Sequence, residues 1–239
     1  NPLLKKEIQY AVYWSLNFFS TNFLDGFTKY SQDYYLLHKS EFENNDYIEE
    51  AIENGDLLNF EKLDKIPKII HYCWFGKGPK SDLILMCIES WKKYAPDFEI
   101  IEWNEDNCDI NENKYVEKAY EDKKWAFVSD YFRLKVLYEM GGVYLDTDME
   151  LMKPLEPCLY QNAFFAFETP IFIHAGIIGA VPHHNLIYKI MTSYQNDEFC
   201  VEVKNIPKTI PMRITEILSK ETNLVKNGKM QILDGNIKI

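Results

Sequence analysis

The stretch WAFVSDYFRLKVLYEMGGVYLDTDME, residues 125–150, decides the fold. Its first part, Trp125 to Met140, predicts one helix, and the Gly141-Gly142 pair predicts an abrupt end to that helix. The apolar positions of this helix recur every three or four residues and predict one buried face: Phe127, Tyr131, Leu134 and Tyr138. Residues 143–145 then predict a short strand that ends at an Asp-Thr-Asp triplet. In open α/β sheets, ligands bind at that end of the strands.

Asp146 and Asp148 carry the chemistry at the end of this strand. In an extended segment residues i and i+2 face the same way, so the two carboxylates are predicted to project together. Neighbouring carboxylates repel one another unless a cation lies near them. Hard oxygen ligands suit Mg²⁺ or Mn²⁺, which reach proteins through one or two carboxylates plus substrate phosphates. The alternative is a pair of exposed turn carboxylates without a ligand.

Asp130 and Arg133 stand three residues apart on the predicted helix and therefore share a face. One interpretation is a surface ion pair, which contributes only about 0.3 kcal/mol. The other uses the apolar surroundings, in which charges need partners. Arg133 would then bind a diphosphate or leaving-group oxygen, and Asp130 would accept hydrogen bonds from a ribose or sugar hydroxyl.

Upstream, residues 68–75 predict a strand that is closed by the loop Gly76–Pro79. Ser81 predicts the N-cap of a helix, and residues 98–103 predict a second strand before a polar loop at 104–113. The apolar face predicted for this helix consists of Leu83, Ile84, Cys87, Ile88 and Trp91. Strand, helix and strand with short links indicate an α/β sheet with crossover helices.

Residues 1–62 lack the alternation of apolar and polar residues that is typical of strands, and they predict an N-terminal helical region. One domain is predicted to follow over residues 63–239. The stretch 8–19 is amphipathic and aromatic, and is too short and too polar for a spanning helix or a signal-peptide core. Its apolar stripe is predicted to pack on the neighbouring domain, with contact to a membrane surface as the less favoured alternative. We expect a soluble protein in the cytosol of a bacterium, or of a host cell if it is a secreted effector.

Composition narrows the class of function. The 239 residues carry a formal net charge of −11, which argues against a sequence-independent nucleic-acid binder because such proteins need a basic surface. The five cysteines are scattered and contain no CxxC pair, so neither a disulfide framework nor a thiolate zinc site fits. We expect buried free thiols in a reducing compartment.

Three segments together resemble a known family: IPKIIHYCWFG, SDYFRLKVLYEMGG and VYLDTDMEL. They are similar to the glycosyltransferases with a DXD sugar-binding region, which include capsular-polysaccharide transferases and the initiating α-1,6-mannosyltransferases of fungal N-glycans. The glucosylating domains of large clostridial toxins are more distant members. The resemblance covers roughly residues 66–180, with weaker echoes in HAGIIGA (174–180) and IPMRITEIL (210–218). It implies a GT-A fold, a Rossmann-like mixed sheet flanked by helices, and retaining transfer from a nucleotide-activated sugar with Mn²⁺ or Mg²⁺.

The resemblance also implies roles for single residues. Trp74 corresponds to the aromatic residue that stacks on the nucleotide base; the alternative is a core tryptophan. Ser129, Asp130 and Arg133 match the positions that contact ribose, sugar hydroxyls and phosphate-side oxygens. Asp146 and Asp148 match the metal-binding DXD, with Asp148 as the more direct ligand. Two further residues, Trp125 and Tyr144, fall where they can line the nucleotide pocket.

Two departures from the family pattern concern the second half of the chain. Relatives often carry Asn where this chain has His174, which is predicted either to tune acceptor choice or to be a hydrogen-bonded core histidine. GT-A sites commonly draw a further metal or phosphate ligand from a late segment, and no such residue is identifiable before Ile239, so the C-terminal end is expected to be incomplete.

The leading hypothesis is therefore a retaining, metal-dependent glycosyltransferase that uses a nucleoside diphosphate sugar, with a UDP-sugar favoured. Its catalytic residues are predicted to be Asp130, Arg133 and Asp148, and its acceptor a glycan or a protein. Two alternatives stay open: a non-catalytic nucleotide-sugar-binding domain of a larger effector, and an Asp-dependent phosphatase. The phosphatase is less favoured because its Asp-x-Asp motif normally lies on the first strand of the domain.

Overall fold

The computed structural model describes residues 66–195, 197, 199 and 208–239. The chain divides into two compact units, residues 1–64 with 153–158 and residues 65–152 with 159–239. Of the first unit only residues 153–158 are described, and they contain one turn of 3-10 helix, η2 (Glu156–Cys158). The predicted N-terminal helical region, residues 1–62, lies outside the described residues, so the sheet and helices described below belong to the second unit.

A mixed sheet of seven strands runs through the described part of the second unit, in the spatial order β2-β1-β3-β5-β4-β7-β6. The strands β1, β2 and β3 are parallel to one another, whereas β5 runs antiparallel to both β3 and β4. Their bounds are β1 (Ile69–Cys73), β2 (Glu99–Trp103), β3 (Gly142–Leu145), β4 (Ala163–Thr169), β5 (Phe172–Ala180), β6 (Ile232–Leu233) and β7 (Ile237–Lys238). The three strands predicted from sequence are confirmed with shifts of one or two residues at their ends.

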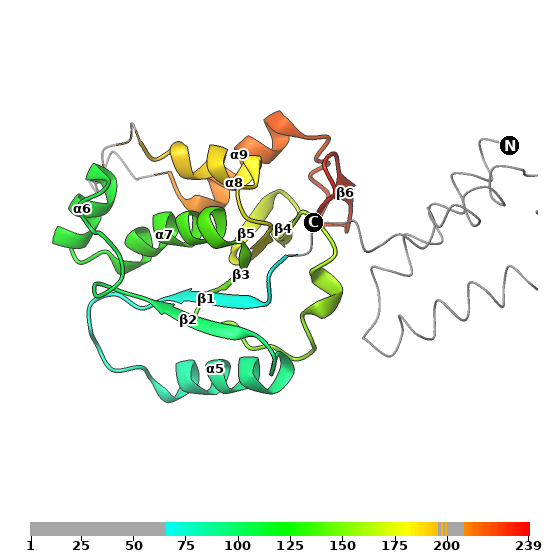
Figure 1. Ribbon diagram of the computed structural model, residues 1–239. Coiled ribbons are helices and arrows are strands. Elements are labelled where there is room, and N and C mark those ends of the chain that lie inside the picture. Colours follow the sequence, from blue (N-terminus) through cyan, green and yellow to red (C-terminus); the bar gives the residue numbers. More distant parts are fainter. Residues whose placement is uncertain (1–65, 196, 198, 200–207) are drawn as a thin grey trace, which may run out of the picture. The chain divides into compact units, whose positions relative to one another are not determined.

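Helices cover both faces of the sheet, and α5 lies on the opposite face from α7, α8 and α9 (Figure 1). The helices are α5 (Asp82–Tyr94), α6 (Lys114–Glu121), α7 (Trp125–Met140), α8 (Asn185–Thr192) and α9 (Ile210–Glu221). Crossover helices join β1 to β2 and β2 to β3, as parallel strands of one sheet require. The predicted α/β class is confirmed.

Helix α5 begins as predicted, because the Ser81 side chain accepts a hydrogen bond from the Ile84 N–H. Its predicted apolar face is only partly buried. Cys87, Ile88 and Trp91 are in the core, whereas Leu83 is 57% exposed and Ile84 is half-buried. The prediction for Leu83 was wrong because burial on this helix begins only after its first turn.

Helix α7 has the predicted bounds and ends at Gly141, which has a φ of +67°. Its burial is broader than the predicted stripe, since it lies between the sheet and α8 (Figure 1). Phe127 and Tyr138 are only partly buried, while residues on other sides of the helix are fully enclosed, among them Val128, Phe132 and Val136. A single-face pattern was the wrong expectation for a helix packed on several sides.

His71 links three elements in the centre of the sheet. Its Nε2–H donates to the Gly141 carbonyl at 2.8 Å, and its Nδ1 accepts from the Trp103 Nε1–H at 3.0 Å. Burial lowers the pKa of His71 to about 4, so the ring stays neutral at pH 7. Gly142 leaves room for this ring, because a Cβ there would lie 3.0 Å from His71 Nε2 and 2.8 Å from the Ile69 carbonyl oxygen.

Cys73, Cys87 and Cys108 are free thiols, as predicted. Cys73 and Cys87 are buried, Cys108 and Cys158 are partly exposed, and Cys200 lies outside the described residues. Within the described ranges no helix combines the length and the apolar character needed to cross a membrane.

Candidate active site

The predicted site residues gather where β1, β2 and β3 end. Because these strands are parallel, their carboxyl ends share one edge of the sheet, hereafter the carboxyl edge. Trp74 follows β1, Asn104 follows β2 and Asp146 follows β3. The first two loops are joined directly, since the Trp74 N–H donates to the Trp103 carbonyl at 2.8 Å. Helix α7 begins at this edge because its other end leads straight into β3.

The DXD residues lie in a turn. The Asp146 N–H donates to the Gly176 carbonyl at 2.8 Å, and the Met149 N–H donates back to the Asp146 carbonyl at 3.0 Å. This bond between residues i and i+3 is that of a β-turn, so the extended segment assumed for Asp146 and Asp148 ends at Leu145. The argument that both carboxylates project from one strand face was therefore wrong, although both remain at the carboxyl edge.

The two acids have different environments. Tyr144 O–H donates to Asp146 Oδ1 at 3.1 Å, and Arg133 Nη1 lies 3.2 Å from Oδ1 and 3.3 Å from Oδ2. Asp148 is exposed, and its carboxylate has no hydrogen bond or ion pair with any residue that the structure describes. Asp146 is thus fixed in place, whereas Asp148 keeps its oxygen atoms available for a ligand.

Asp130 and Arg133 form a buried ion pair at 3.0 Å, with exposed fractions of 7% and 4%. The interpretation as a surface pair was wrong because both groups are enclosed. Arg133 also donates to the Ala175 carbonyl at 2.7 Å and lies 4.6 Å from the centre of the Tyr144 ring. The N–H groups of Arg133 donate to protein acceptors, and through them Arg133 connects Asp130 to Asp146. Its predicted direct contact with a diphosphate stays a prediction.

The protonation of Asp130 responds to this environment. The pKa of Asp130 is raised to about 6, chiefly by burial; the Arg133 and Arg213 guanidinium groups oppose the rise, and the nearby Asp146 carboxylate contributes to it. Asp130 therefore carries its charge at pH 7 and gains a proton in mild acid.

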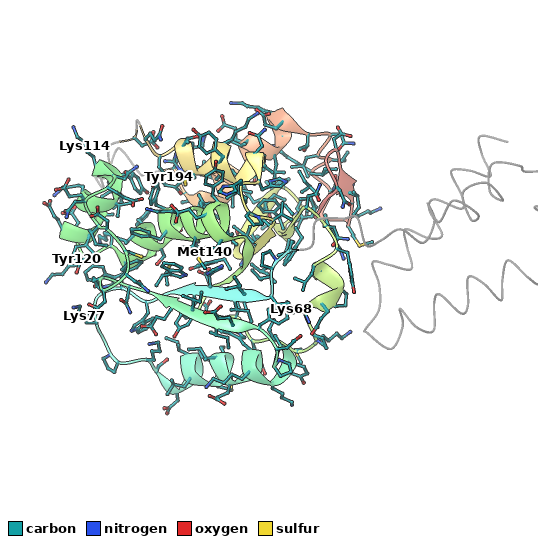
Figure 2. The ribbon with its side chains drawn as sticks, viewed as in Figure 1. Lys68, Lys77, Lys114, Tyr120, Met140 and Tyr194 are labelled. Carbon is teal, nitrogen blue, oxygen red and sulfur yellow. The ribbon has the colours of Figure 1, made fainter. Side chains whose placement is uncertain are left out.

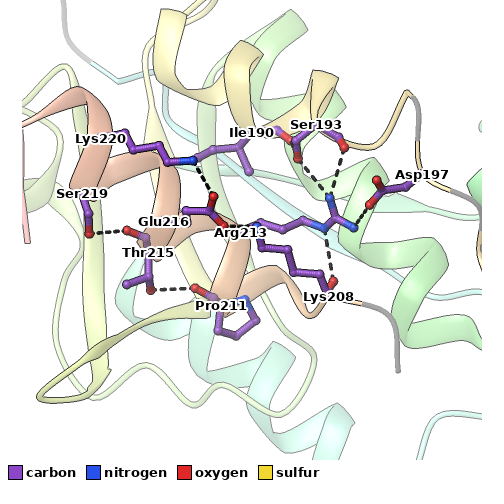
Figure 3. A network of polar contacts seen from close by, with 10 residues as sticks. All are labelled: Ile190, Ser193, Asp197, Lys208, Pro211, Arg213, Thr215, Glu216, Ser219 and Lys220. Carbon is purple, nitrogen blue, oxygen red and sulfur yellow. Dashed lines mark hydrogen bonds and ion pairs between the residues drawn. The ribbon is translucent and has the colours of Figure 1, made fainter. Parts of the chain in front are cut away.

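Arg213 is a second buried cation, 3% exposed, close to the same cluster. It donates to the Ser193 carbonyl at 3.1 Å and to the Lys208 carbonyl at 3.2 Å, and it pairs with Asp197 (Figure 3). Its guanidinium lies 4.1 Å from the centre of the Tyr194 ring. Arg213 thereby ties the end of α8 to the beginning of α9. Sequence reasoning missed it, and the only signal was the weak resemblance of residues 210–218.

A cavity of about 230 Å³ opens beside Trp74. The indole Nε1–H donates to the Gly78 carbonyl at 2.8 Å, and Lys80 Nζ lies 5.4 Å from the indole ring centre. Lys80 is held by Glu102 at 2.7 Å. The cavity is lined by Trp74, Lys77, Gly78, Lys80, Glu102, Asn104, Glu105 and Asp106. Trp74 is thus partly exposed on a cavity wall and is not a core tryptophan, while its stacking on a base stays a prediction.

Trp125 packs against the loop that follows β1. A Cβ on Gly76 would lie 2.6 Å from the Trp125 indole, which also packs edge-on against Tyr120 at 5.0 Å between ring centres. Glu105 accepts from the Gly76 N–H at 2.7 Å and from the Tyr120 O–H at 3.1 Å. Figure 2 shows Lys77 and Tyr120 on one side of the molecule and Lys68 on the other. Glu105 therefore holds the loop after β1 against α6.

Two predicted site residues, Tyr144 and Ser129, do not line the cavity beside Trp74. Tyr144 is 1% exposed and its hydroxyl supports Asp146, while its contact with a donor nucleotide stays a prediction. Ser129 donates from Oγ to the Trp125 carbonyl at 3.0 Å and its own carbonyl accepts from Arg133 Nε at 3.3 Å. Ser129 is only partly buried, and it lies beside the ion pair at the carboxyl edge.

The donor set fits a hard divalent cation that relies on its substrate for further ligands. Among the described residues no three His, Cys, Asp or Glu side chains come together as a metal cluster. Only the carboxylates of Asp146 and Asp148 stand at the turn, and Mg²⁺ is typically bound through one or two carboxylates plus substrate phosphates. The exposed, unpaired carboxylate of Asp148 is the group best suited to such an ion.

Residues 81–165 match the family described as glycosyltransferase sugar-binding region containing DXD motif. Mannosyl phosphorylinositol ceramide synthase SUR1 of Saccharomyces cerevisiae is 28% identical over 207 residues, 79% of this chain and 52% of that protein. Inositol phosphoceramide mannosyltransferase 2 of Schizosaccharomyces pombe is 29% identical over 157 residues, 59% of this chain and 43% of that protein. The chain spans about half the length of the curated relatives it matches.

A solved structure, the PaToxG glycosyltransferase, superimposes with a TM-score of 0.52 and 19% identity, over 72% of this chain and 77% of that one. This likeness concerns the fold, and it agrees with the GT-A architecture expected from sequence. The matched region runs from the N-cap of α5 into β4 and includes Asp130, Arg133, Asp146 and Asp148, so this part of the chain is similar to the glycosyltransferase sugar-binding region that contains the DXD motif.

Proposed function

We propose that this chain transfers a sugar from a nucleoside diphosphate sugar to an acceptor hydroxyl. The observation that carries the proposal is the network around Arg133, which joins Asp130 to Asp146 beside the exposed Asp148. The cavity beside Trp74 lies at the same carboxyl edge, so the base and the diphosphate sugar of one donor would each meet suitable groups.

The donor is proposed to place its base against Trp74, because base–aromatic stacking works for every base. A UDP-sugar is the first donor to test. GDP-mannose is the second, since several relatives are named mannosyltransferases. The names of these relatives also point to an acceptor with a phosphorylinositol ceramide headgroup, alongside the glycan and protein acceptors expected from sequence.

Mn²⁺ or Mg²⁺ is proposed as the cofactor, held by Asp148 and Asp146; such an ion neutralises charge on the departing diphosphate. The protein side of the reaction then consists of positioning. Arg133 keeps Asp146 in place, and Asp130 balances the charge of Arg133. Asp130 and Asp146 are both engaged by Arg133, so neither is free to act as an enzyme nucleophile. This favours a same-face, retaining substitution over a double displacement.

The test is release of nucleotide from a panel of labelled nucleotide sugars, with Mn²⁺, Mg²⁺ or EDTA. Transfer or slow hydrolysis that requires the ion and disappears in Asp148→Asn would support the proposal. Binding of a nucleotide sugar without release would favour a non-catalytic binding domain, and release of inorganic phosphate from phosphomonoesters would favour the phosphatase. No binding and no release with any donor would overturn the proposal.

A further inference from the structure

The turn between β4 and β5 exposes large apolar side chains. The two strands pair as far as Thr169 and Phe172, so Pro170 and Ile171 form the tight turn between them. Ile171 is 54% exposed and Phe172 is 37% exposed. Turns are usually built from polar residues, glycine and proline, so two neighbouring large apolar side chains exposed at one turn point to a partner outside the chain.

A second loop lies against this turn. A Cβ on Gly228 would lie 3.2 Å from the Pro170 Cα, which places the loop after α9 beside the hairpin. In this loop Val225 is 57% exposed, and Lys226 and Lys229 are exposed as well. Neither lysine forms an ion pair with any residue in the described ranges. The turn and the loop make up one surface, hereafter the tip surface: Pro170, Ile171, Phe172, Val225, Lys226 and Lys229.

Gln231 holds the second loop in this arrangement. Its side-chain oxygen accepts from the Val225 N–H at 2.8 Å, and its side-chain N–H groups donate to the Val225 carbonyl at 2.8 Å and to the Lys229 carbonyl at 3.2 Å. The Asn227 side chain accepts from the Lys229 N–H at 2.8 Å. Hydrogen bonds thus fix the backbone of the loop and leave its apolar and charged side chains exposed. A surface that is ordered in advance loses less conformational entropy on binding.

The charge of the tip surface is opposite to that of the whole chain. The formal net charge is −11, yet the sequence between Glu221, which pairs with Lys189, and Asp234 holds two lysines and no acid. Glu168 is the only acid of the hairpin, residues 163–180. Exposed apolar groups beside lysines fit the interface of a bilayer with anionic lipids, where apolar side chains enter below the headgroups and each nearby lysine adds attraction.

A second copy or another protein fits the tip surface less well. Two-fold contact between identical surfaces would bring the lysines of one copy against those of the other, and like charges repel. A specific protein interface takes about 20–30 residues from each partner, whereas the tip surface comprises only one turn and one short loop. A bilayer requires no such matching area.

The tip surface lies on the same strand as part of the candidate active site. The Asp146 N–H donates to the Gly176 carbonyl, and Phe172 precedes Gly176 by four residues on β5. At about 3.3 Å per residue this separation is roughly 13 Å. Between them, His174 is partly buried, and its Nδ1 accepts from the Gly176 N–H at 2.9 Å. A Cβ on Gly176 would lie 2.3 Å from His174 Cε1 and 3.0 Å from Asp146 Oδ2, so the strand leads from the DXD turn to the tip surface.

We propose that the tip surface docks this chain on a lipid bilayer that contains anionic lipids. The side chains of Ile171, Phe172 and Val225 enter the boundary between headgroups and acyl chains, and Lys226 and Lys229 contact the anionic headgroups. Docking turns the carboxyl edge towards the membrane, close to the headgroups among which a lipid acceptor would be presented. The inference does not depend on the proposed function, since docking needs neither a sugar donor nor a metal ion.

The experiment is co-sedimentation of the full chain with vesicles of phosphatidylcholine, alone or mixed with phosphatidylserine. The wild-type protein should bind the mixed vesicles, and its binding should weaken as salt is added. Ile171→Ser combined with Phe172→Ser should lower the partition coefficient more than tenfold, because two apolar side chains no longer leave water. Lys226→Gln and Lys229→Gln should each lower it about fivefold on the mixed vesicles.

Leu83→Ser combined with Met86→Ser is the matched control. These side chains are 57% and 50% exposed on α5, which covers the opposite face of the sheet from α9 (Figure 1). Lys92→Gln and Lys93→Gln, on the same helix, are the corresponding controls for charge. All of these variants should bind the mixed vesicles as the wild-type protein does, and circular dichroism checks that each variant is folded.

Failure of the wild-type protein to bind the mixed vesicles would overturn the inference, and so would equal binding to vesicles without phosphatidylserine. Binding that survives the paired substitution of Ile171 and Phe172 would overturn it in favour of another segment, such as residues 1–62. Light scattering without vesicles tests for a second copy, and a dimer that the same pair of substitutions dissociates would overturn membrane docking in favour of self-association. Nucleotide release without vesicles is measured separately, so failure of the proposed function is distinguishable from failure of this inference.

Discussion

Asp148 and Asp146 are two residues apart, and the difference between them arises from the turn that follows β3. Asp146 receives hydrogen bonds from Tyr144 and from Arg133, and its backbone is bound to Gly176. Asp148 is exposed and has no partner among the residues described. One acid is thus part of the structure, and the other can be changed without disturbing it.

Asp148→Asn should therefore abolish nucleotide release and weaken Mn²⁺ binding without lowering the melting temperature. Surface substitutions away from buried groups usually change stability by no more than about 0.5 kcal/mol. Calorimetric titration with Mn²⁺ and thermal unfolding, measured on one preparation, check both statements. Normal turnover in this variant would contradict the metal assignment, and a large fall in melting temperature would contradict the exposed environment.

Arg133→Ala, unlike Asp148→Asn, is expected to lower the stability of the fold. Removing the guanidinium leaves Asp130 charged and buried, which typically costs about 3–5 kcal/mol of stability. Asp146 would also lose a positioning contact, so turnover should fall as well. Arg133→Lys should restore only part of both, because an ammonium lacks the planar fork that reaches Asp130, Asp146 and the Ala175 carbonyl together. Urea unfolding and kcat/KM for the two variants test this, and an Arg133→Ala protein as stable as wild type would contradict the buried pair.

The sequence could not predict which residues Arg133, Tyr144 and His174 contact. The spacing of Asp130 and Arg133 shows that they share a helix face, and the apolar neighbours indicate burial. Nothing in the spacing connects Arg133 to Asp146, because that contact depends on how α7 packs against β3. The role of Tyr144 depends on the same packing. His174 and Gly176 come from a strand far along the chain, so their place beside Asp146 required the pairing of β5 with β3.

At the scale of elements, β1 is held in the sheet by a buried histidine as well as by its ladder. His71 donates to Gly141, at the end of α7, and accepts from Trp103, at the end of β2. Gly141 directly precedes β3, which leads to Asp146, and Trp103 directly precedes the loop after β2. The bridge therefore couples the position of α7 to that of the loop after β2.

His71→Ala should lower the free energy of unfolding by about 2–6 kcal/mol, since it leaves the Gly141 carbonyl and the Trp103 indole N–H without partners at about 1–3 kcal/mol each. Trp103→Phe is the matched comparison, because it removes only one of the two hydrogen bonds and should cost less. Urea unfolding of both variants measures the difference. An equal or larger loss in Trp103→Phe would argue against the bridge through His71.

The loops after β1 and β2 form the cavity beside Trp74. If the base stacks there, Trp74→Ala should raise the donor dissociation constant tenfold or more, in line with roughly 1–3 kcal/mol per stacked base. Stability should change little, since Trp74 is partly exposed. Titration calorimetry with the donor and thermal unfolding on the same sample distinguish the two effects. A steep fall in melting temperature with unchanged affinity would show that the indole is structural.

Elements with local signals could be predicted from sequence. Gly141-Gly142 marks the end of α7, and Ser81 marks the beginning of α5. The hairpin of β4 and β5, the parallel pairing of β4 with β7 and the turn that contains the DXD residues lack such signals, because they depend on partners that are distant in the chain. Local signals therefore predicted only the parallel part of the sheet, whereas the mixed character of the sheet was expected from the family resemblance alone.

At the scale of the whole molecule, two buried groups make the stability depend on pH in opposite directions. Asp130 has a pKa raised to about 6, so between pH 6 and 4 the folded state holds a proton that the unfolded state lacks, and stability rises as the pH falls. His71 has a pKa lowered to about 4, so between pH 6.5 and 4 the unfolded state binds the extra proton, and stability falls. At about 1.4 kcal/mol per pKa unit, each contribution amounts to roughly 3 kcal/mol, and the two nearly cancel.

Asp130→Asn should remove one side of this balance. Relative to wild type, its free energy of unfolding should fall progressively as the pH is lowered from 7 to 4, by up to about 3 kcal/mol, because the variant lacks the proton uptake that stabilises the native protein. His71→Gln should show the reverse trend and gain stability relative to wild type over the same range. Urea unfolding at a series of pH values gives both difference curves, in which the contributions of all other groups cancel. Parallel curves for wild type and Asp130→Asn would mean that Asp130 titrates at its ordinary pKa, and the buried charge network at the carboxyl edge would then need a different explanation.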